Sequence, residues 1–374
     1  MSGRRRALLA AALLLVAGPA LAPSGCAPPG SGSIGVVVPL TGALKEWGLE
    51  LQAGIRLALD EDADATRRVL WSDNGGTAIG TTAAIEHLVG QGATVIVGPL
   101  TTDNAVTAGI VARTLRVPLV VPAATGPDVT PPGSSSVRLC YEDAQAGRAL
   151  ARWAAAEAGL SRVAVVVDLD SAYSLGLASA FEREFRRLGL RVTGEVPYRS
   201  GGEERAGVLD AVAALDVEGA LVAGYAPDIV VMLQGARSEA VAGLVLLGGD
   251  VWSGSGLRQA LVGRVAAAYH TRHLDPTATD PRVTGFLAAY EARHQAPPSD
   301  AAALGYDAAR VVLSIHDPLA GGAELLARLR AVQGFPGVTG TVSLDPLGSA
   351  MGKPVVLVRL DGEDGPEVIG RLDG

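Results

Sequence analysis

The sequence predicts an α/β protein of two doubly wound lobes, in which buried parallel strands alternate with helices. Continuous β-branched runs bounded by glycine or proline, such as residues 95–97, are typical of strands buried on both faces of a sheet. Such runs alternate with helical stretches from Ile34 to about residue 158, and the alternation begins again at Arg162. The length of 374 residues is sufficient for two domains of ordinary size.

In the first unit, hydroxyl-rich turns follow two neighbouring strands. They are Leu100-Thr101-Thr102 and Ala123-Ala124-Thr125. Ligands of such sheets bind outside the carboxyl ends of the strands, and the start of a helix favours an anion, so the two turns predict a carboxylate site. The alternative is that Thr102 only caps its helix. The expected strands of this unit are 34–38, 70–71, 95–97, 119–121 and 137–139, and the expected helices are 49–61, 77–91, 102–115 and 143–158.

The second unit repeats the alternation, and the remainder of the chain is mainly helical. The late helices have no sheet of their own, so they must pack on an earlier unit, and the chain should cross between the lobes more than once. The expected strands are 163–167, 192–196, 219–222 and 244–247, with helices from about residue 173 to 188, at 205–215 and at 228–238. After Ala268 come helices at 281–295, 299–315 and 322–332, then strands at 337–343 and 355–360.

The amino terminus has the features of a secretory signal. Three arginines at 4–6 precede an apolar run at 7–17 that is too short to span a bilayer. We expect a signal peptide over residues 1–25 and a flexible tether over residues 26–33. Cleavage after Ala22 is one possibility, but Pro23 should resist it, and lipidation of Cys26 is the favoured alternative. The expected location is the periplasm or the cell surface, with a lipid anchor to the membrane.

Signals of catalysis and of nucleic-acid binding are lacking in the sequence. It contains no Gly-x-Ser-x-Gly elbow, no phosphate-binding glycine-rich loop with lysine, and no Gly-x-Gly-x-x-Gly after the first strand. His270 and His273 lie three residues apart in a strand-like segment and would face opposite ways, so no metal site is predicted. The formal net charge of −8 argues against a nucleic-acid partner. We expect a non-enzymatic protein without a cofactor.

Polar or aromatic residues follow the carboxyl ends of nearly all expected strands. For each residue alone a structural role is the commoner explanation, but their joint placement at the edges of two lobes is informative. Hydroxyl and N–H groups on one lobe suit a carboxylate, whereas Tyr225 and Asp250 on the other suit an ammonium group. Trp47 offers an apolar wall. A cleft for a zwitterion, an α-amino acid, is therefore predicted from Trp47, Thr102, Thr125, Tyr173, Tyr225 and Asp250.

Several segments, spread in order over nearly the whole mature chain, carry a family resemblance. They are IGVVVPLTG (34–42), EWG (46–48), VIVGPLTT (95–102), VPAAT (121–125), GYAPD (224–228), LGGDVW (247–252), PSDAAALGYDAARVV (298–312), GVTGTVSLDPLG (337–348) and KPVVLVRLDG (353–362). Through these segments the sequence resembles the solute-binding proteins of branched-chain amino-acid ABC transporters, the leucine/isoleucine/valine-binding family of type 1 periplasmic binding proteins.

The resemblance implies two Rossmann-like lobes that are joined by three crossovers and close on a ligand through a hinge. Lobe 1 would comprise residues 34–142 and 272–350, and lobe 2 would comprise residues 143–271 and 351–374. By similarity, the two hydroxyl-rich turns hold the ligand carboxylate, the two tyrosines cover the ligand, Asp250 faces its ammonium group, and Trp47 adjoins its side chain. The implied ligand-binding set is Trp47, Leu100, Thr101, Thr102, Ala123, Ala124, Thr125, Tyr173, Tyr225 and Asp250.

The same resemblance implies a function. A monomer outside the cytoplasm would capture an L-amino acid with an aliphatic or otherwise uncharged side chain and deliver it to an ABC permease. Two alternatives remain open: the same fold could bind another small carboxylate or amide, or the protein could sense a ligand without feeding a transporter. Asp250 argues against a plain carboxylic acid, because its buried charge would be left unpaired.

Overall fold

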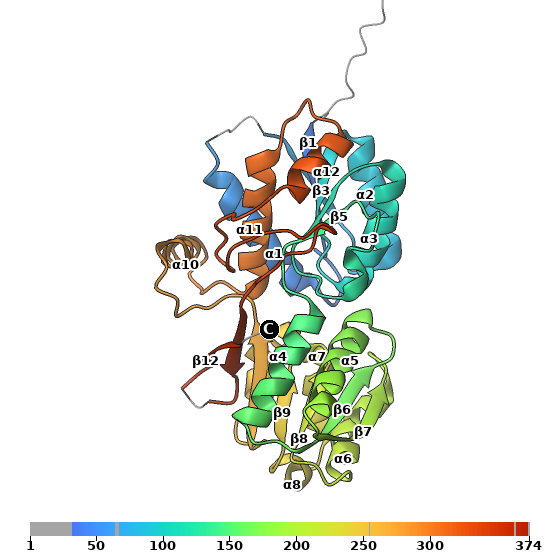
Figure 1. The fold of residues 1–374 in the computed structure, drawn as a ribbon, viewed down its shortest axis with the longest axis vertical. Coiled ribbons are helices and arrows are strands. Elements are labelled where there is room, and N and C mark those ends of the chain that lie inside the picture. Colours follow the sequence, from blue (N-terminus) through green and yellow to red (C-terminus); the bar gives the residue numbers. More distant parts are fainter. Residues whose placement is uncertain (1–31, 64–66, 254, 363, 373–374) are drawn as a thin grey trace, which may run out of the picture.

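The computed structural model describes residues 32–63, 67–253, 255–362 and 364–372. The expected signal peptide, Cys26 and all of the tether except its last two residues lie outside these ranges. Figure 1 shows two lobes stacked along the long axis of the molecule, each built around one sheet with helices on its faces. The α/β fold class with two doubly wound lobes is therefore confirmed.

Lobe 1 contains a five-stranded parallel sheet in the order β2-β1-β3-β4-β5. Alternate residues of β1 and β3 face opposite sides of this sheet and belong to two hydrophobic cores. The core on one side includes residues of α1 and α11, and the core on the other side includes residues of α2 and α3. The strands are β1 (Ser33–Val38), β2 (Val69–Asp73), β3 (Ala93–Val97), β4 (Leu119–Val121) and β5 (Ser136–Arg138). The helices are α1 (Lys45–Asp60), α2 (Ala78–Gly90), α3 (Thr102–Leu115), η1 (Pro127–Val129), α10 (Pro281–His294), α11 (Asp300–Ile315) and α12 (Gly322–Arg330).

Lobe 2 contains a seven-stranded sheet in the order β12-β11-β10-β9-β8-β6-β7. Strands β6 to β10 pair in parallel, whereas β11 and β12 join the edge in antiparallel fashion. The strands are β6 (Arg162–Asp168), β7 (Arg191–Tyr198), β8 (Gly219–Ala223), β9 (Val245–Gly248), β10 (Ala267–Arg272), β11 (Val355–Arg359) and β12 (Glu367–Leu372). The helices are α4 (Asp143–Ala156), α5 (Ala172–Arg187), η2 (Glu203–Gly207), α6 (Val208–Ala213), α7 (Ala226–Gly235), α8 (Ser238–Val241), η3 (Asp250–Trp252) and α9 (Ser255–Leu261).

Three segments differ from the sequence-based expectation. Residues 337–343 form no strand, because the N–H groups of Val338 and Thr339 donate to the Asp307 carboxylate and Gly340 has a φ of 101°. The helix expected at 205–215 is divided into η2 and α6. Strand β12 was not expected; it is an edge strand, in which exposed positions alternate with partly buried ones.

The chain crosses between the sheets three times, through residues 139–142, 273–280 and 351–354. Two crossovers are tied together by Arg138, whose buried guanidinium donates to Ser349 Oγ at 2.6 and 3.0 Å and also to Glu142. The same guanidinium donates to the carbonyl oxygens of Thr125, at 3.2 Å, and Gly126. One cation therefore joins the base of the hinge to the turn after β4.

Lobe 1 is closed by the packing of α11 on α1, which confirms that the late helices return to the earlier unit (Figure 1). The two backbones approach closely at two glycines. A Cβ on Gly54 would lie 1.8 Å from the carbonyl oxygen of Ala302, and a Cβ on Gly305 would lie 2.4 Å from that of Leu51. The absence of these two Cβ atoms therefore sets the spacing of the helices and the position of the first turn of α11.

Gly54→Ala is expected to destabilise the protein by about 1–3 kcal/mol, because the added methyl group forces α11 away from α1. Urea-induced unfolding of the two proteins measures the difference in free energy. The control is Gly285→Ala in the exposed middle of α10, where a Cβ meets no atom within 4 Å. The control should be neutral or stabilising by up to about 1 kcal/mol. Equal effects at both positions would contradict the close approach.

Burial of His270 in β10 predicts a pH-dependent stability. Desolvation, assisted by Arg272, lowers the pKa of this imidazole from 6.5 to about 4. Between these values the unfolded chain binds a proton that the folded protein does not, so the free energy of unfolding falls as pH falls from about 6.5 to 4, by roughly 3 kcal/mol. His270→Gln should remove this part of the pH dependence in urea titrations at pH 7, 5.5 and 4.5. Parallel curves for the two proteins would contradict the assignment.

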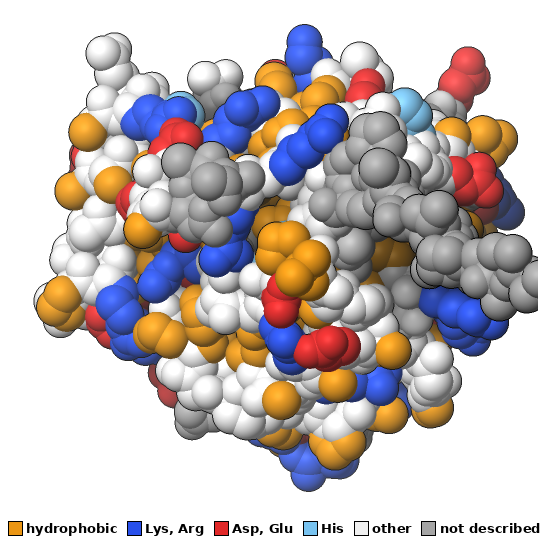
Figure 2. Space-filling model, turned by 90° about the horizontal axis from the view of Figure 1, so that it is seen from above, with side chains coloured by type: hydrophobic (Ala, Val, Ile, Leu, Met, Phe, Trp, Pro, Cys, Tyr) orange, Lys and Arg blue, Asp and Glu red, His pale blue; other side chains and the backbone are white. Residues whose placement is uncertain are grey.

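The surface of the lobe 1 end carries charges of both signs. Figure 2 shows Lys and Arg side chains interspersed with acidic and hydrophobic ones over this face. Neither basic nor acidic side chains predominate on this face.

Candidate functional site

A small cavity lies between the lobes, with a volume of about 50 Å³. All ten residues of the expected ligand-binding set line it. They come from the carboxyl ends of β3 and β4 and the start of α1 on lobe 1, and from loops after β6, β8 and β9 on lobe 2. The structure therefore brings these ten residues together around one cavity, while the role of each residue toward a ligand stays a prediction.

The lobe 1 wall is formed by the two hydroxyl-rich turns. Helix α3 begins at Thr102, and its N-cap is Thr101, which makes no side-chain capping bond. The interpretation of Thr102 as a simple cap is therefore wrong. Its Oγ1 instead accepts a hydrogen bond from the Gly126 N–H at 3.2 Å and so fastens the two turns to each other. The first N–H groups of α3 have no partner within the helix, which leaves positive potential at this wall.

The lobe 2 wall carries Asp250, at the start of η3. Its Oδ2 lies 3.0 Å from Nε2 of His273, whose ring stacks on Tyr141 with the ring centroids 3.8 Å apart. Among the described residues, Oδ1 of Asp250 has no hydrogen-bond partner. The preceding Gly249 is required here, because a Cβ would lie 2.0 Å from the Tyr173 hydroxyl. One carboxylate oxygen is thus held in place, and the other remains available.

Aromatic rings close one side of the cavity. The centroid of Tyr225 lies 5.6 Å from that of Trp47 and 5.6 Å from that of Tyr173. Burial, and next the charge of Asp250, raises the pKa of Tyr173 well above its usual value, and burial also raises the pKa of Tyr225. Both hydroxyls therefore stay protonated and can donate. The Tyr173 hydroxyl is buried without a partner among the described residues.

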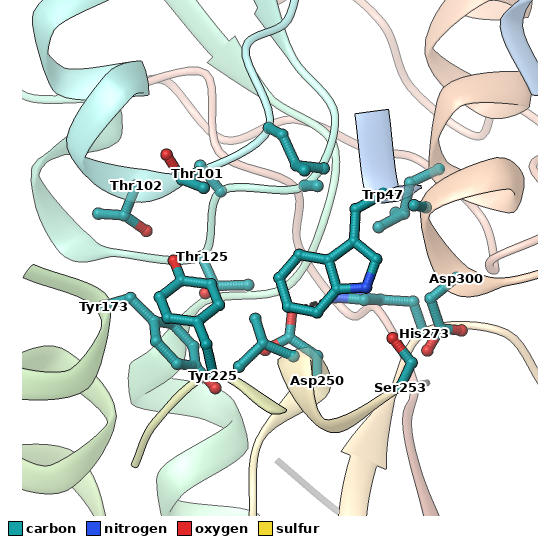
Figure 3. A pocket seen from close by; sticks show the side chains of 16 residues that line it. Trp47, Thr101, Thr102, Thr125, Tyr173, Tyr225, Asp250, Ser253, His273 and Asp300 are labelled. Atoms are coloured by element: carbon teal, nitrogen blue, oxygen red, sulfur yellow. Dashed lines mark hydrogen bonds and ion pairs between the residues drawn. The ribbon is translucent and has the colours of Figure 1, made fainter. Parts of the chain in front are cut away.

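The cleft is also closed by a direct contact between the lobes. The Asp103 carboxylate, in the first turn of α3, accepts a hydrogen bond of 3.1 Å from the backbone N–H of Ala172 at the start of α5. Figure 3 shows Thr101, Thr102 and Thr125 toward one end of the cavity and Asp300, His273 and Ser253 toward the other, with Asp250 between them.

Six lining residues were missed by the sequence analysis. His273 follows the carboxyl end of β10, a position shared by the predicted residues, but the strand-like segment there was considered only as a metal site. Asp300 stands in a segment that carried the family resemblance, but no residue of that segment was assigned a role. The missed residues are Val251, Ser253, His273, Asp300, Ala301 and Leu304.

Asp300 at the first turn of α11 is 4% exposed. Its Oδ1 accepts hydrogen bonds from the Leu274 N–H at 2.8 Å and from Nε of Arg272 at 3.2 Å. Its Oδ2 is buried and has no partner among the described residues. A second carboxylate residue that lines the cavity thus carries an acceptor atom without a partner among the described residues.

Metal binding and membrane crossing find no support in the part of the chain that the structure describes. No three His, Cys, Asp or Glu side chains there are grouped to hold a metal ion. None of the helices there combines the length and the apolar character that a membrane crossing needs.

Comparisons with known proteins agree with this architecture. Residues 32–366 match the family described as periplasmic binding protein. The Leu/Ile/Val-binding protein BraC3 of Rhizobium johnstonii is 28% identical over 226 residues, which are 58% of this chain and 61% of that protein. The aligned part thus spans about three fifths of this curated relative.

Two solved structures are similar over almost their full lengths. The leucine-binding protein LivK of Thermotoga maritima has a TM-score of 0.84 and 26% identity, over 91% of this chain and 98% of that one. A solute-binding protein of an ABC transporter from R. palustris, solved in complex with benzoate, has a TM-score of 0.79 and 19% identity, over 91% and 96%. The sequence match and the shared two-lobe fold lead to one conclusion: this chain belongs to the periplasmic binding protein family.

Proposed function

We propose that this protein is an extracytoplasmic solute-binding protein that captures an L-amino acid between its lobes and delivers it, unchanged, to an ABC permease. The observation that carries the proposal is the polarity of the cavity across the two lobes. Lobe 1 offers hydroxyls and the start of α3, and lobe 2 offers the available oxygen of Asp250. The similarity to Leu/Ile/Val-binding and leucine-binding proteins supports the same class of ligand.

Each end of a zwitterion meets a complementary group in this arrangement. The α-carboxylate lies against the turns at Thr102 and Thr125, where free N–H groups and hydroxyls donate to it. The ammonium group lies against Oδ1 of Asp250, so that neither buried charge is left unpaired. The protonated hydroxyls of Tyr173 and Tyr225 cover the ligand from lobe 2. Chemical conversion is not part of the proposal, because the cavity pairs no nucleophile with a general base.

Closure couples the ligand to the shape of the protein. A ligand that touches both walls stabilises the arrangement in which Asp103 reaches Ala172, and an open form lacks this contact. The permease would then distinguish the closed, loaded protein from the open one. We propose that the protein acts as a monomer outside the cytoplasm, anchored by lipid at Cys26, with no nucleic acid as partner. A ligand sensor that feeds no transporter is the alternative, and permease and ATPase genes beside its own would exclude it.

A second candidate is the binding of a carboxylate without an amine, since a neighbour with the same fold was solved with benzoate. The charge of Asp250 opposes it, because no ammonium group would meet Oδ1. The two candidates therefore predict different responses to the removal of the ligand amine.

Thermal unfolding of the mature protein with the twenty L-amino acids, benzoates, urea and short amides tests the proposal. At least one L-amino acid should raise the midpoint temperature of unfolding, and its decarboxylated and N-acetylated forms should not. Stabilisation by benzoates alone would favour the second candidate. Stabilisation by none of these compounds would contradict both.

A further inference from the structure

Resting on the proposed function, the geometry points to an amino acid whose side chain ends in a neutral hydrogen-bond donor, a hydroxyl or a carboxamide. Among the aliphatic or otherwise uncharged side chains that the sequence analysis expected, this selects the polar ones. The inference concerns the end of the cavity opposite the two threonine turns. It depends on Asp300, Ser253 and the charge of Arg272.

The first observation is the unsatisfied oxygen of Asp300. This side chain lines the cavity, is 4% exposed, and uses only Oδ1 for contacts with the protein. Oδ2 is buried without a partner among the described residues. Leaving a carboxylate oxygen buried and unsatisfied costs free energy, so an oxygen of this kind on a residue that lines a binding cavity is expected to meet a donor on the ligand.

The second observation is the position of this oxygen relative to the ends of the ligand. The threonine turns, which hold the α-carboxylate, lie toward one end of the cavity, and Asp300 lies with Ser253 toward the other (Figure 3). Asp250, the partner of the ammonium group, lies between them. A side chain that leaves the α-carbon away from the carboxylate therefore extends toward Asp300. In the same view the ring of Trp47, which also lines the cavity, lies between these two ends.

A third observation favours a neutral donor over a cation at the end of the ligand side chain. The charge of Asp300 is already opposed by Arg272, whose Nε lies 3.2 Å from Oδ1, with exposed fractions of 17% and 6% for the two side chains. A ligand ammonium group would add a second cation to this pair, whereas a hydroxyl or amide N–H satisfies Oδ2 without one. The hydroxyl of Ser253 also has no partner among the described residues, so it can accept from or donate to the same ligand group.

The size of the cavity limits the ligand. Its 50 Å³ corresponds to a few water molecules, since one water needs about 10–15 Å³ on the same scale. Compact polar side chains fit this space better than long ones. Threonine, serine and asparagine are representative of the class.

Calorimetric titration of the full mature protein with matched amino-acid pairs tests the inference. The pairs are threonine and valine, asparagine and leucine, and glutamine and methionine, in which the members are similar in size but differ in a donor. In at least one pair the polar member should bind roughly tenfold tighter or more, the scale of a hydrogen bond to a charged group. Equal or tighter binding of the apolar member in all three pairs would overturn the inference, as would tightest binding of ornithine or lysine.

Two variants connect the preference to its proposed cause. Asp300→Asn turns Oδ2 into a donor or leaves Oδ1 without its charge. The variant should therefore bind the polar member of a pair no more than about threefold tighter than the apolar member. Ser253→Ala should reduce the ratio partly. Asp280→Asn, at the start of α10 and outside the cavity, is the control, and an asparagine preserves its N-cap bond to Arg282. If Asp300→Asn does not fold, the wild-type ratio and Ser253→Ala still decide the question.

The outcome also separates this inference from the proposed function. If no L-amino acid binds, the proposed function itself fails. If amino acids bind but aliphatic ones are preferred in all pairs, the proposed function stands and the role of Asp300 is wrong.

Discussion

Replacement of Asp250 by alanine is expected to weaken the binding of an L-amino acid by about 2–5 kcal/mol, which is the usual cost of removing one partner from a buried charge pair. The ligand ammonium group would face the cavity without a counter-charge, because the other carboxylate that lines the cavity, Asp300, is already paired with Arg272. Calorimetric titration of the wild-type protein and the variant measures the effect directly.

A surface aspartate on the same lobe provides the control for this measurement. Asp170 lies in the loop after β6, is paired with Arg199, and has a side chain that is 55% exposed. Asp170→Ala should leave the affinity within about threefold of the wild-type value. A loss of less than tenfold for Asp250→Ala, with an unchanged fold by circular dichroism, would show that Asp250 does not meet the ammonium group.

The largest loss of stability is expected at Asp307, in the middle of α11. Its fully buried carboxylate accepts hydrogen bonds from the N–H groups of Val338 and Thr339, at 2.8 and 2.9 Å, and from the Thr339 hydroxyl at 2.6 Å. The Thr339 hydroxyl in turn accepts from Nζ of Lys353 at 2.6 Å. Burial lowers the pKa of Lys353, and the nearby charge of Asp307 partly opposes this shift.

Asp307→Ala should therefore lower the free energy of unfolding by about 3–5 kcal/mol, because buried donors and a buried cation lose their acceptor. Urea denaturation gives the value. The control is Asp60→Ala at the end of α1, where the side chain is 55% exposed and pairs with Arg293. It should cost less than about 1 kcal/mol. Comparable losses for the two variants would show that the network around Asp307 contributes little.

Most of the fold could be predicted from local sequence patterns. Strand β4 begins and ends at the residues that its continuous apolar run indicated, and helix α3 begins and ends at the residues expected for the helix before it. Ten of the sixteen residues that line the cavity could be found because parallel strands end at one edge of a sheet, so that each loop at that edge is a candidate. The local pattern was therefore enough to locate this part of the cavity.

The remaining lining residues depend on contacts between distant parts of the chain. His273 enters the site through its stacking on Tyr141, and Asp300 through the packing of α11 on α1 at Gly54. Neither contact leaves a periodic signal in the segment that it positions. The strand expected at 337–343 failed for the same reason, since its N–H groups are taken by Asp307, which lies about thirty residues earlier.

The cluster of Arg138, Glu142 and Ser349 limits which substitutions this protein can accept. Its guanidinium contacts the turn at Thr125 through backbone oxygens, but contacts Ser349 and Glu142 through their side chains. Residues at the turn are therefore free to vary as long as the backbone keeps its course, and new ligand preferences can arise there. Arg138, Glu142 and Ser349, in contrast, depend on one another's side chains, so we expect them to change as a set and more slowly than the turn.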